Sequence, residues 1–259
     1  MQKSIKNISF AGSGNVAWHL AQALYRQGFT IGMIWSRDFS KATALAKTCN
    51  SVACNNISDL TRDSDLIVVA VPDNSIEEVA SAIGNYDGLV VHTAGSVPIE
   101  VLKINFKRSG VFYPLQTFSK EIPVAMEDVP FFIEASHLED FELLMAVASR
   151  LSSKVYPAYS HQRLLLHVAA VFAGNYSNLM YVVGNQLLTN SNLPSEVLHP
   201  LISATANKAI AGNPLQTQTG PARRNDTLTI EKHIAALASM PQFAELYRNL
   251  ANLISKNYK

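Results

Sequence analysis

The apolar positions at the start of the chain describe a strand, a turn and a helix. Residues 5–11 are predicted to form a short buried strand. Val16, Leu20 and Leu24 then fall on one face of a helix, and Gly28 is suited to terminate it. The chain therefore begins with the order expected of a β-α-β unit.

Further apolar runs continue this alternation. The run over 65–71 is the clearest, because an unbroken series of β-branched and aliphatic residues is what a strand buried on both faces requires, and Pro72 ends it. Strands are predicted over 5–11, 31–35, 51–54, 65–71, 89–93, 110–113, 131–134 and 155–156. With helices between most of them, these strands predict a doubly wound, mostly parallel Rossmann sheet.

Two of the connecting helices carry start signals. The alanine-rich helix predicted over 41–47 has Ser40 as its expected N-cap. Asn74 followed by Glu77 has the form of a capping box, which opens the helix that ends at Ile83.

The strand pattern stops near residue 160. Helices are predicted over 161–189, 194–211, 227–238 and 241–257, with Pro194 suited to a first helical turn. The sequence thus predicts a dinucleotide-binding Rossmann domain over 1–159 and an all-α domain over 160–259, expected to hold substrate and to form a dimer.

Composition narrows the classes of partner. The 21 basic and 20 acidic residues are scattered and give a net charge of +1, which indicates neither a nucleic-acid surface nor a membrane surface. No apolar segment has membrane-spanning length, and the start of the chain has no signal region, so a cytoplasmic location is expected. Cys49 and Cys54 lie apart from any histidine cluster and are interpreted as reduced core thiols, with no metal site.

A glycine-rich turn lies between the first strand and the first helix. Gly12-Ser13-Gly14-Asn15-Val16-Ala17 fits the dinucleotide fingerprint, in which the first glycine makes the turn and the second lets the backbone approach a pyrophosphate. The helix N-terminus adds N–H donors for that anion. The alternative is a purely structural glycine turn.

The end of the second strand decides between NAD and NADP. Ser36 and Arg37 stand where an NAD-binding protein carries an acidic residue, and a hydroxyl with a guanidinium suits a 2′-phosphate. NADP is therefore favoured over NAD. Asp38 is the contrary observation, since a small shift of the strand end would place a carboxylate near the ribose. Lys41 adds a charge that is equally well explained as solvated.

Ligands of open α/β sheets bind beyond the carboxyl ends of the strands. There Val71 and Pro72 are expected to cover the dinucleotide, with Thr93 beside it, although a plain turn would look the same. The loop after the fifth strand offers His92 for proton transfer and Ser96 for substrate, with a structural role for His92 as the alternative.

The remaining candidates are polar residues at a strand end and in the helical half. Gln116 and Thr117 could orient substrate, or form an ordinary turn. His167 and Asn175 lie about two helical turns apart within an apolar stretch, so His167 needs a partner, either substrate or a backbone carbonyl. Arg224 and Asp226 follow a Gly-Pro turn and could bind an anionic substrate, with helix capping by Asp226 as the alternative.

Taken together, the chain resembles a family of Rossmann-like proteins assigned as NADP oxidoreductases, whose C-terminal half is a helical domain of unknown function. The resemblance covers nearly the whole chain. It rests on the fingerprint 12–17, on His92-Thr93-Ala94-Gly95, on Pro114-Leu115-Gln116-Thr117-Phe118, on His167 with Asn175-Tyr176, and on Thr219-Gly220-Pro221 with Arg224 and Asp226. More distantly the chain is similar to pyrroline-5-carboxylate reductase and 3-hydroxyisobutyrate dehydrogenase. That similarity implies an active site between the two halves.

The chain departs from the family at two positions. Tyr113 stands where the family usually has histidine, and Asn225 stands where it usually has glycine. The lysine that the 3-hydroxyisobutyrate group uses at the start of its helical half is also absent; His167 is the nearest polar candidate.

Three functions are consistent with these observations. The leading hypothesis is hydride transfer between NADP(H) and a small carbonyl, imine or hydroxyacid, with His92 or His167 handling the proton and Ser96, Gln116, Asn175 and Arg224 positioning substrate. A non-catalytic NADP-binding sensor or interaction module is the main alternative, and a non-redox enzyme is the third.

Overall fold

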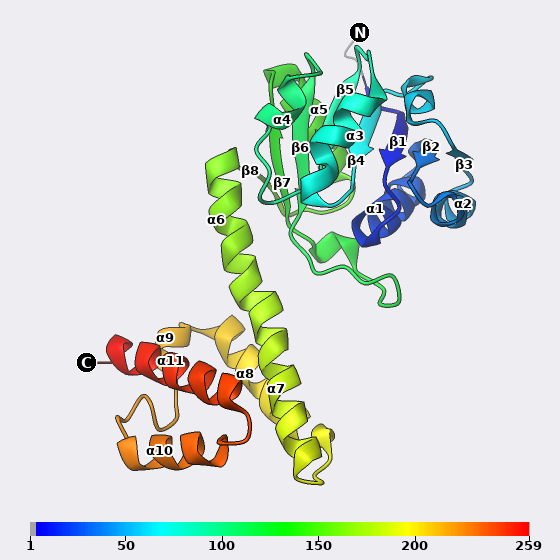
Figure 1. The fold of residues 1–259 in the computed structure, drawn as a ribbon. Helices are drawn as coiled ribbons and strands as arrows, with labels where there is room; N and C mark the ends of the chain where they lie inside the picture. Colours follow the sequence, from blue (N-terminus) through cyan, green and yellow to red (C-terminus); the bar gives the residue numbers. More distant parts are fainter. Residues whose placement is uncertain (1–3, 259) are drawn as a thin grey trace. The chain divides into compact units, whose positions relative to one another are not determined.

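The structure, a computed structural model, describes residues 4–258 (Figure 1). The chain divides into two compact units, one that extends through Gly174 and one that begins at Asn175. The expected domain boundary at residue 160 coincides with the change from strands to helices and stays a prediction, because the first compact unit continues along the following helix.

The first unit contains one eight-stranded sheet with the strand order β3-β2-β1-β4-β5-β6-β7-β8. Neighbouring strands are parallel except for β6 and β7, which are antiparallel. The strands are β1 Asn7–Ala11, β2 Thr30–Trp35, β3 Val52–Cys54, β4 Leu66–Val69, β5 Leu89–His92, β6 Ser109–Pro114, β7 Phe131–Ala135 and β8 Val155–Pro157. The predicted doubly wound, mostly parallel sheet is therefore confirmed.

Strand order reverses at β1. The chain runs outward from β1 to β2 and β3, and then returns to the other side of β1 as β4. The connections at the carboxyl ends of β1 and β4 consequently leave in opposite directions, which opens a crevice between them. The fingerprint turn follows β1 directly, so the topology places it at this crevice.

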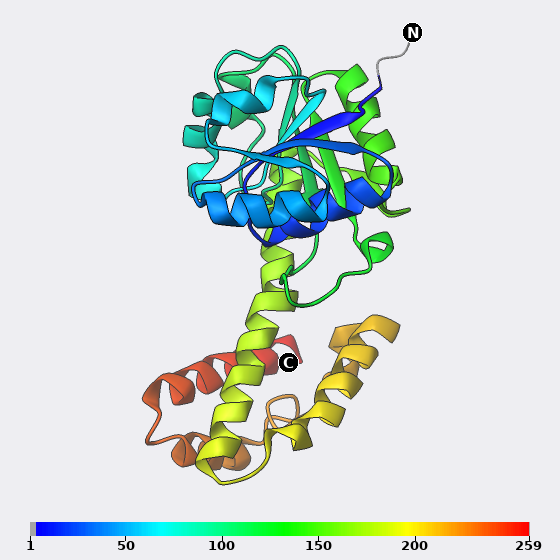
Figure 2. The same ribbon diagram turned by 90° about the vertical axis from the view of Figure 1, so that its right-hand side faces the viewer.

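Helices cover both faces of the sheet. One face packs against α1 Asn15–Arg26, α2 Phe39–Thr48 and α5 Leu138–Ser149, and the other against the 3-10 helix η1 Ile57–Thr61, α3 Ile76–Ile83 and α4 Glu100–Lys103. Figure 2 shows α3 (cyan) on one side of the strands and α5 (green) on the other. The interior β4 run is buried along its whole length, as expected of a strand that is covered on both faces.

Both predicted helix starts need correction. The N-cap of α2 is Asp38 and not Ser40; the Asp38 carboxylate accepts the backbone N–H groups of Ser40 and Lys41. The capping box is not formed, because Asn74 lies within a 3-10 turn, Asp73–Ser75, and α3 begins only at Ile76. Asn74 is therefore too early to cap the helix.

A single helical run crosses from one unit to the other. It consists of α6 Ser160–Ala170, a π-helical turn Val171–Tyr176 and α7 Ser177–Asn190. The pattern over 161–189 predicted the run but not its π turn. The second unit continues with the 3-10 helix η5 Ser195–Leu198 and with α8 His199–Ala211, α9 Pro214–Thr217, α10 Thr227–Ala236 and α11 Pro241–Asn257.

The second unit has little core of its own. Among residues 175–258, the buried apolar side chains are Ala222, Leu237 and Ala251. Large apolar side chains on its helices are exposed instead, including Leu201, Ile210, Leu228 and Leu253. Of the helices that the structure describes, none has the length and apolar character needed to cross a membrane.

Both cysteines are free and buried, as interpreted from the sequence. Burial raises the pKa of each thiol, which keeps both protonated near neutral pH. Within residues 4–258 no cluster of His, Cys, Asp and Glu side chains has the form of a metal site.

Candidate functional site

A cleft of about 520 Å³ lies at the crevice between β1 and β4. Its walls come from three strand ends that are far apart in sequence. The expected cofactor residues that line it are Gly12, Ser13, Gly14, Asn15, Ser36, Arg37, Val71 and Pro72; Trp35, Asp38, Lys41, Ala70 and Lys120 also line it. Val16 and Thr93, which were expected to contact the cofactor, do not line this cleft.

The two fingerprint glycines have different reasons to be glycine. Gly12 has a φ of +124°, and a Cβ there would lie 2.1 Å from the carbonyl oxygen of Ala70. Only glycine therefore permits the turn to pack against the end of β4. At Gly14 a Cβ would meet no atom within 4 Å. Gly14 thus leaves open space on the cleft wall, where a pyrophosphate would approach the backbone.

The N-terminus of α1 faces the same turn. Gly14 is its N-cap, and no described side chain caps the helix. The first-turn N–H groups consequently have no side-chain acceptor, and the first turn holds no acidic residue. This arrangement favours binding of an anion.

The ribose end of the cleft is formed by the residues after β2. Ser13 Oγ donates a hydrogen bond to Ser36 Oγ at 2.9 Å, which ties the turn to this segment. The guanidinium of Arg37 is exposed and, among the described residues, has no carboxylate partner. It is therefore free to bind a ligand phosphate.

Asp38 is engaged elsewhere, although it lines the cleft. Its carboxylate accepts hydrogen bonds from Ser40 Oγ and from the N–H groups of Ser40 and Lys41, and Lys41 Nζ lies 3.3 Å from it. The Ser40 hydrogen bond is the main reason that the pKa of Asp38 is lowered. These contacts weaken the case for Asp38 as the acceptor of a ribose hydroxyl and favour NADP over NAD.

His92 lies in the protein interior. Its side chain has no exposed surface, and Nδ1 accepts the backbone N–H of Ala94 at 3.2 Å. Burial, assisted by the nearby Arg163 guanidinium, lowers the pKa of His92 to about 3. The imidazole is therefore neutral at neutral pH and has no access to a ligand in this structure. This supports the structural reading of His92.

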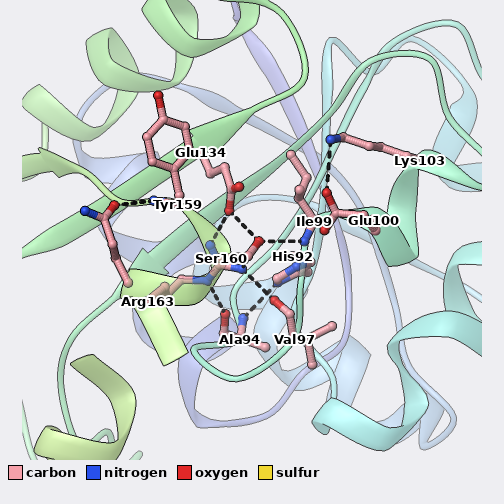
Figure 3. Close-up of polar contacts among 11 residues, drawn as sticks. His92, Ala94, Val97, Ile99, Glu100, Lys103, Glu134, Tyr159, Ser160 and Arg163 are labelled. Carbon is pink, nitrogen blue, oxygen red and sulfur yellow. Dashed lines mark hydrogen bonds and ion pairs between the residues drawn. The ribbon is translucent and has the colours of Figure 1, made fainter. Parts of the chain in front are cut away.

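Arg163 fastens the loop that follows β5 (Figure 3). Arg163 is fully buried, and its guanidinium donates to the carbonyl oxygens of Ala94, at 3.2 Å, and Val97, at 2.6 Å. It also forms an ion pair with Glu134 of β7. Ser160 completes the network by donating to Glu134 and accepting the backbone N–H of Ile99. The start of α6 thereby fixes the conformation of residues 94–99.

His167 lies against the same loop, one helical turn after Arg163. Tyr113 Oη and His167 Nδ1 are 3.0 Å apart, within hydrogen-bonding distance. A Cβ on Gly95 would lie 2.7 Å from the His167 ring, so the imidazole packs directly on the Gly95 backbone. The partner of His167 is thus a tyrosine hydroxyl, neither of the two partners anticipated from the sequence. The Tyr113–His167 pair lies beside the carboxyl ends of β5 and β6.

Ser96 lies at the surface of this region. It donates a hydrogen bond to the carboxylate of Asp73, which follows β4. Burial is the main cause that raises the pKa of Tyr113 to about 12, and the Asp73 charge adds to the effect. The phenol is therefore protonated at neutral pH. The structure brings together polar groups from the ends of β4, β5 and β6.

Gln116 and Thr117 are exposed in the loop after β6. The Gln116 side-chain oxygen accepts the backbone N–H of Thr117 at 2.8 Å. This contact orders the turn, and a role in substrate binding stays a prediction.

The candidates of the second unit are described within that unit only. Asn175 lies in the π-helical turn. Asp226 caps α10 by accepting from Thr229, which lowers its pKa and bears out the capping reading. Asn225 has a φ of +54°, a left-handed conformation that asparagine and glycine tolerate. The departure from the family's glycine therefore preserves the backbone beside Arg224.

Two site residues escaped the sequence reasoning. Arg163 is the one charge in the apolar stretch around His167, and that isolation was a usable signal for a buried role. Lys120 lies in the loop after β6, and nothing in the local sequence indicates that it reaches the cleft.

Comparison with known proteins is consistent with this geometry. Residues 7–94 match the family described as NADP oxidoreductase, coenzyme F420-dependent, and residues 129–254 match a domain of unknown function, DUF2520. No curated protein matches the chain.

Three solved structures are similar over the full length. A Bacteroides fragilis protein described as a "putative NADP oxidoreductase" is 41% identical, with a TM-score of 0.92 over 97% of this chain and 98% of that one. A pyrroline-5-carboxylate reductase from Coxiella burnetii is 16% identical, with a TM-score of 0.60 over 98% of each chain. A reductive aminase from Aspergillus terreus, in complex with NADPH and ethyl-5-oxohexanoate, is 16% identical, with a TM-score of 0.72 over 98% of this chain and 93% of that one.

The last two likenesses show the fold alone. The first, together with the two matched segments, confirms the resemblance found in the sequence. The chain belongs to the family of the Bacteroides fragilis protein, and it joins an N-terminal segment that matches the description NADP oxidoreductase, coenzyme F420-dependent, to a C-terminal DUF2520 domain.

Proposed function

We propose that the protein is an NADPH-dependent oxidoreductase that acts on a small carbonyl, imine or hydroxyacid. The observation that carries this proposal is the cleft at the crevice, because it unites the fingerprint turn with Ser36 and Arg37. The backbone of the turn and the start of α1 would hold the pyrophosphate, and Arg37 with Ser36 would hold the 2′-phosphate. When bound, NADPH supplies the hydride.

The Tyr113–His167 pair is the proposed proton source. In its neutral form the pair carries two polar hydrogens, one on the phenol and one on the imidazole. One of them lies in the bond between the two side chains. The other is then available at His167 Nε2 or at Tyr113 Oη for the atom that gains charge during reduction. His92 is not proposed for this step, since it is sealed in the core.

The loop after β5 supports substrate binding. Arg163 and Gly95 hold this loop against α6, which keeps Ser96 and His167 in a fixed arrangement. Ser96, Gln116 and Thr117 would orient the substrate. The NADPH-bound reductive aminase with a ketoester makes ketones with amines the first compounds to test.

The test is oxidation of NADPH, followed by its absorbance, with small ketones, ketoacids and cyclic imines, each ketone with and without an amine. We expect turnover with at least one class, and we expect His167→Gln to lower kcat about a hundredfold while NADPH still binds. NADPH binding without turnover across the panel would instead favour the alternative function, a non-catalytic NADP-binding sensor or interaction module. Unchanged kcat in His167→Gln would remove the proposed proton source.

The proposed assembly is a homodimer formed through the second unit. That unit buries few apolar side chains, although its helices carry many. Exposed apolar surface of this kind is typical of a protein–protein interface. A second copy of the same helices offers a matching apolar surface.

A further inference from the structure

We propose that Lys120 is a further cofactor-binding residue, which contacts a phosphate group of the dinucleotide from the loop after β6. This inference rests on the proposed function, because it concerns the same cleft. Lys120 would add a contact to the cofactor that comes from neither the fingerprint turn nor the end of β2.

The loop is fastened to α1 by two consecutive residues, Phe118 and Ser119. Asn15 Nδ2 donates to the Phe118 carbonyl oxygen at 2.9 Å, and His19 Nε2 donates to the Ser119 carbonyl oxygen at 2.8 Å. The His19 and Phe118 rings also stack, with their centroids 5.2 Å apart. The loop therefore has a defined position against the first turns of α1, beside the N-terminus that would bind the pyrophosphate.

Lys120 follows these anchors immediately. Its ammonium lies 5.0 Å from the centroid of the Trp18 ring, also on α1, and Lys120 is one of the residues that line the cleft. A cation over an aromatic face is held in place without being neutralised. The neighbouring Glu121 accepts a hydrogen bond from Ser119, and Lys120 has no ion pair within the described part of the chain. Its charge is thus available to a ligand.

The charges on the cleft wall favour a polyanion. Arg37, Lys41 and Lys120 are the cations that line it, and Asp38 is the acid. The Asp38 carboxylate already accepts hydrogen bonds from the first N–H groups of α2 and forms an ion pair with Lys41. Arg37 and Lys120 consequently remain as two cations of the cleft without an ion-pair partner among residues 4–258, and they come from distant parts of the sequence. A dinucleotide with both a pyrophosphate and a 2′-phosphate offers an anionic partner for each.

Calorimetric titration of the full chain with NADPH and with NADH tests the assignment. Lys120→Gln removes the charge and keeps most of the side-chain length. Lys47→Gln is the matched control, because Lys47 is exposed on α2 and does not line the cleft. Thermal unfolding of each variant verifies that the fold is intact.

We expect Lys120→Gln to weaken NADPH binding about tenfold, as the loss of one charge-assisted hydrogen bond predicts, and Lys47→Gln to bind as the wild type does. Weakening of NADPH alone assigns Lys120 to the 2′-phosphate, and equal weakening of both dinucleotides assigns it to the pyrophosphate. Unchanged binding in Lys120→Gln, with NADPH bound by the wild type, overturns this inference alone. Failure of the wild type to bind either dinucleotide overturns the proposed function as well.

Discussion

His92 illustrates how the environment of one residue decides its role. The sequence offered it as a proton donor at a strand end, whereas the structure buries it completely and lowers its pKa to about 3. Burial depends on what packs over the strand end, here α6 and its arginine, and the local sequence does not show that. The same chemistry is available at His167, which the sequence could place on a helix but could not pair with Tyr113.

The lowered pKa of His92 predicts a pH dependence of stability. The unfolded chain takes up a proton at His92 near pH 6.5, whereas the folded chain does so only near pH 3. The folded state binds fewer protons in this interval, so the free energy of unfolding falls as the pH drops through it. Urea unfolding at a series of pH values measures this. His92→Gln should flatten the dependence between pH 6.5 and 3; an equally steep dependence in the variant contradicts the assignment.

Gly95 is predicted to be a positioning residue. A Cβ at Gly95 would lie 2.7 Å from the His167 ring, so Gly95→Ala must displace the imidazole. We expect kcat to fall at least about tenfold while the affinity for NADPH is retained. Gly212→Ala is the control, because the nearest atom to its Cβ would be at 3.8 Å. If both variants keep the wild-type kcat, the contact between His167 and the loop does not contribute to catalysis.

Among the elements, the strands were the most predictable. The predicted strands correspond to β1–β8 within a few residues. The signal is clearest for β4 and β5, which are buried along their whole length and are therefore apolar almost throughout. Helix starts were less predictable. The Asn74–Glu77 pattern has the right spacing for a capping box, but a 3-10 turn delays the helix to Ile76. Such a delay depends on the geometry that follows Pro72, not on the spacing of the capping residues.

The junction of α6 with the sheet depends on the Arg163–Glu134 ion pair. Both side chains are almost fully buried, so removal of one leaves an unpaired buried charge. Arg163→Met is expected to lower the free energy of unfolding by about 3–5 kcal/mol in urea denaturation.

Two further variants control this prediction. The double variant Arg163→Met with Glu134→Leu removes both charges and should recover part of the loss. Lys103→Met breaks an exposed ion pair with Glu100 and should cost less than about 1 kcal/mol. Equal small effects of Arg163→Met and Lys103→Met would show that the buried network does not stabilise the junction.

On the scale of the whole molecule, topology explains why the sequence could bring most residues of the cleft together but could not pair Tyr113 with His167. Most residues of the cleft lie at or just after the ends of β1, β2 and β4, and a doubly wound sheet brings those ends to one edge. The Arg163 network and the Tyr113–His167 pair instead require a helix from the second half of the sequence to dock on that edge. Nothing in the spacing of the residues specifies that docking.

The exposed apolar helices of the second unit predict a dimer. Sedimentation at micromolar concentration should give twice the mass of the 28.3 kDa chain. Leu201→Glu combined with Ile210→Glu places charges at two exposed apolar positions of α8 and should shift the equilibrium toward the monomer. A wild-type monomer at that concentration contradicts the proposed assembly.

The central claim is that the cleft binds NADPH and reads its 2′-phosphate through Arg37. The most direct test is calorimetric titration of the wild type and of Arg37→Asp with NADPH and NADH. We predict that the wild type binds NADPH at least about tenfold more tightly than NADH, and that this preference is lost in Arg37→Asp. Tighter binding of NADH by the wild type, or no binding of either dinucleotide, would contradict the claim.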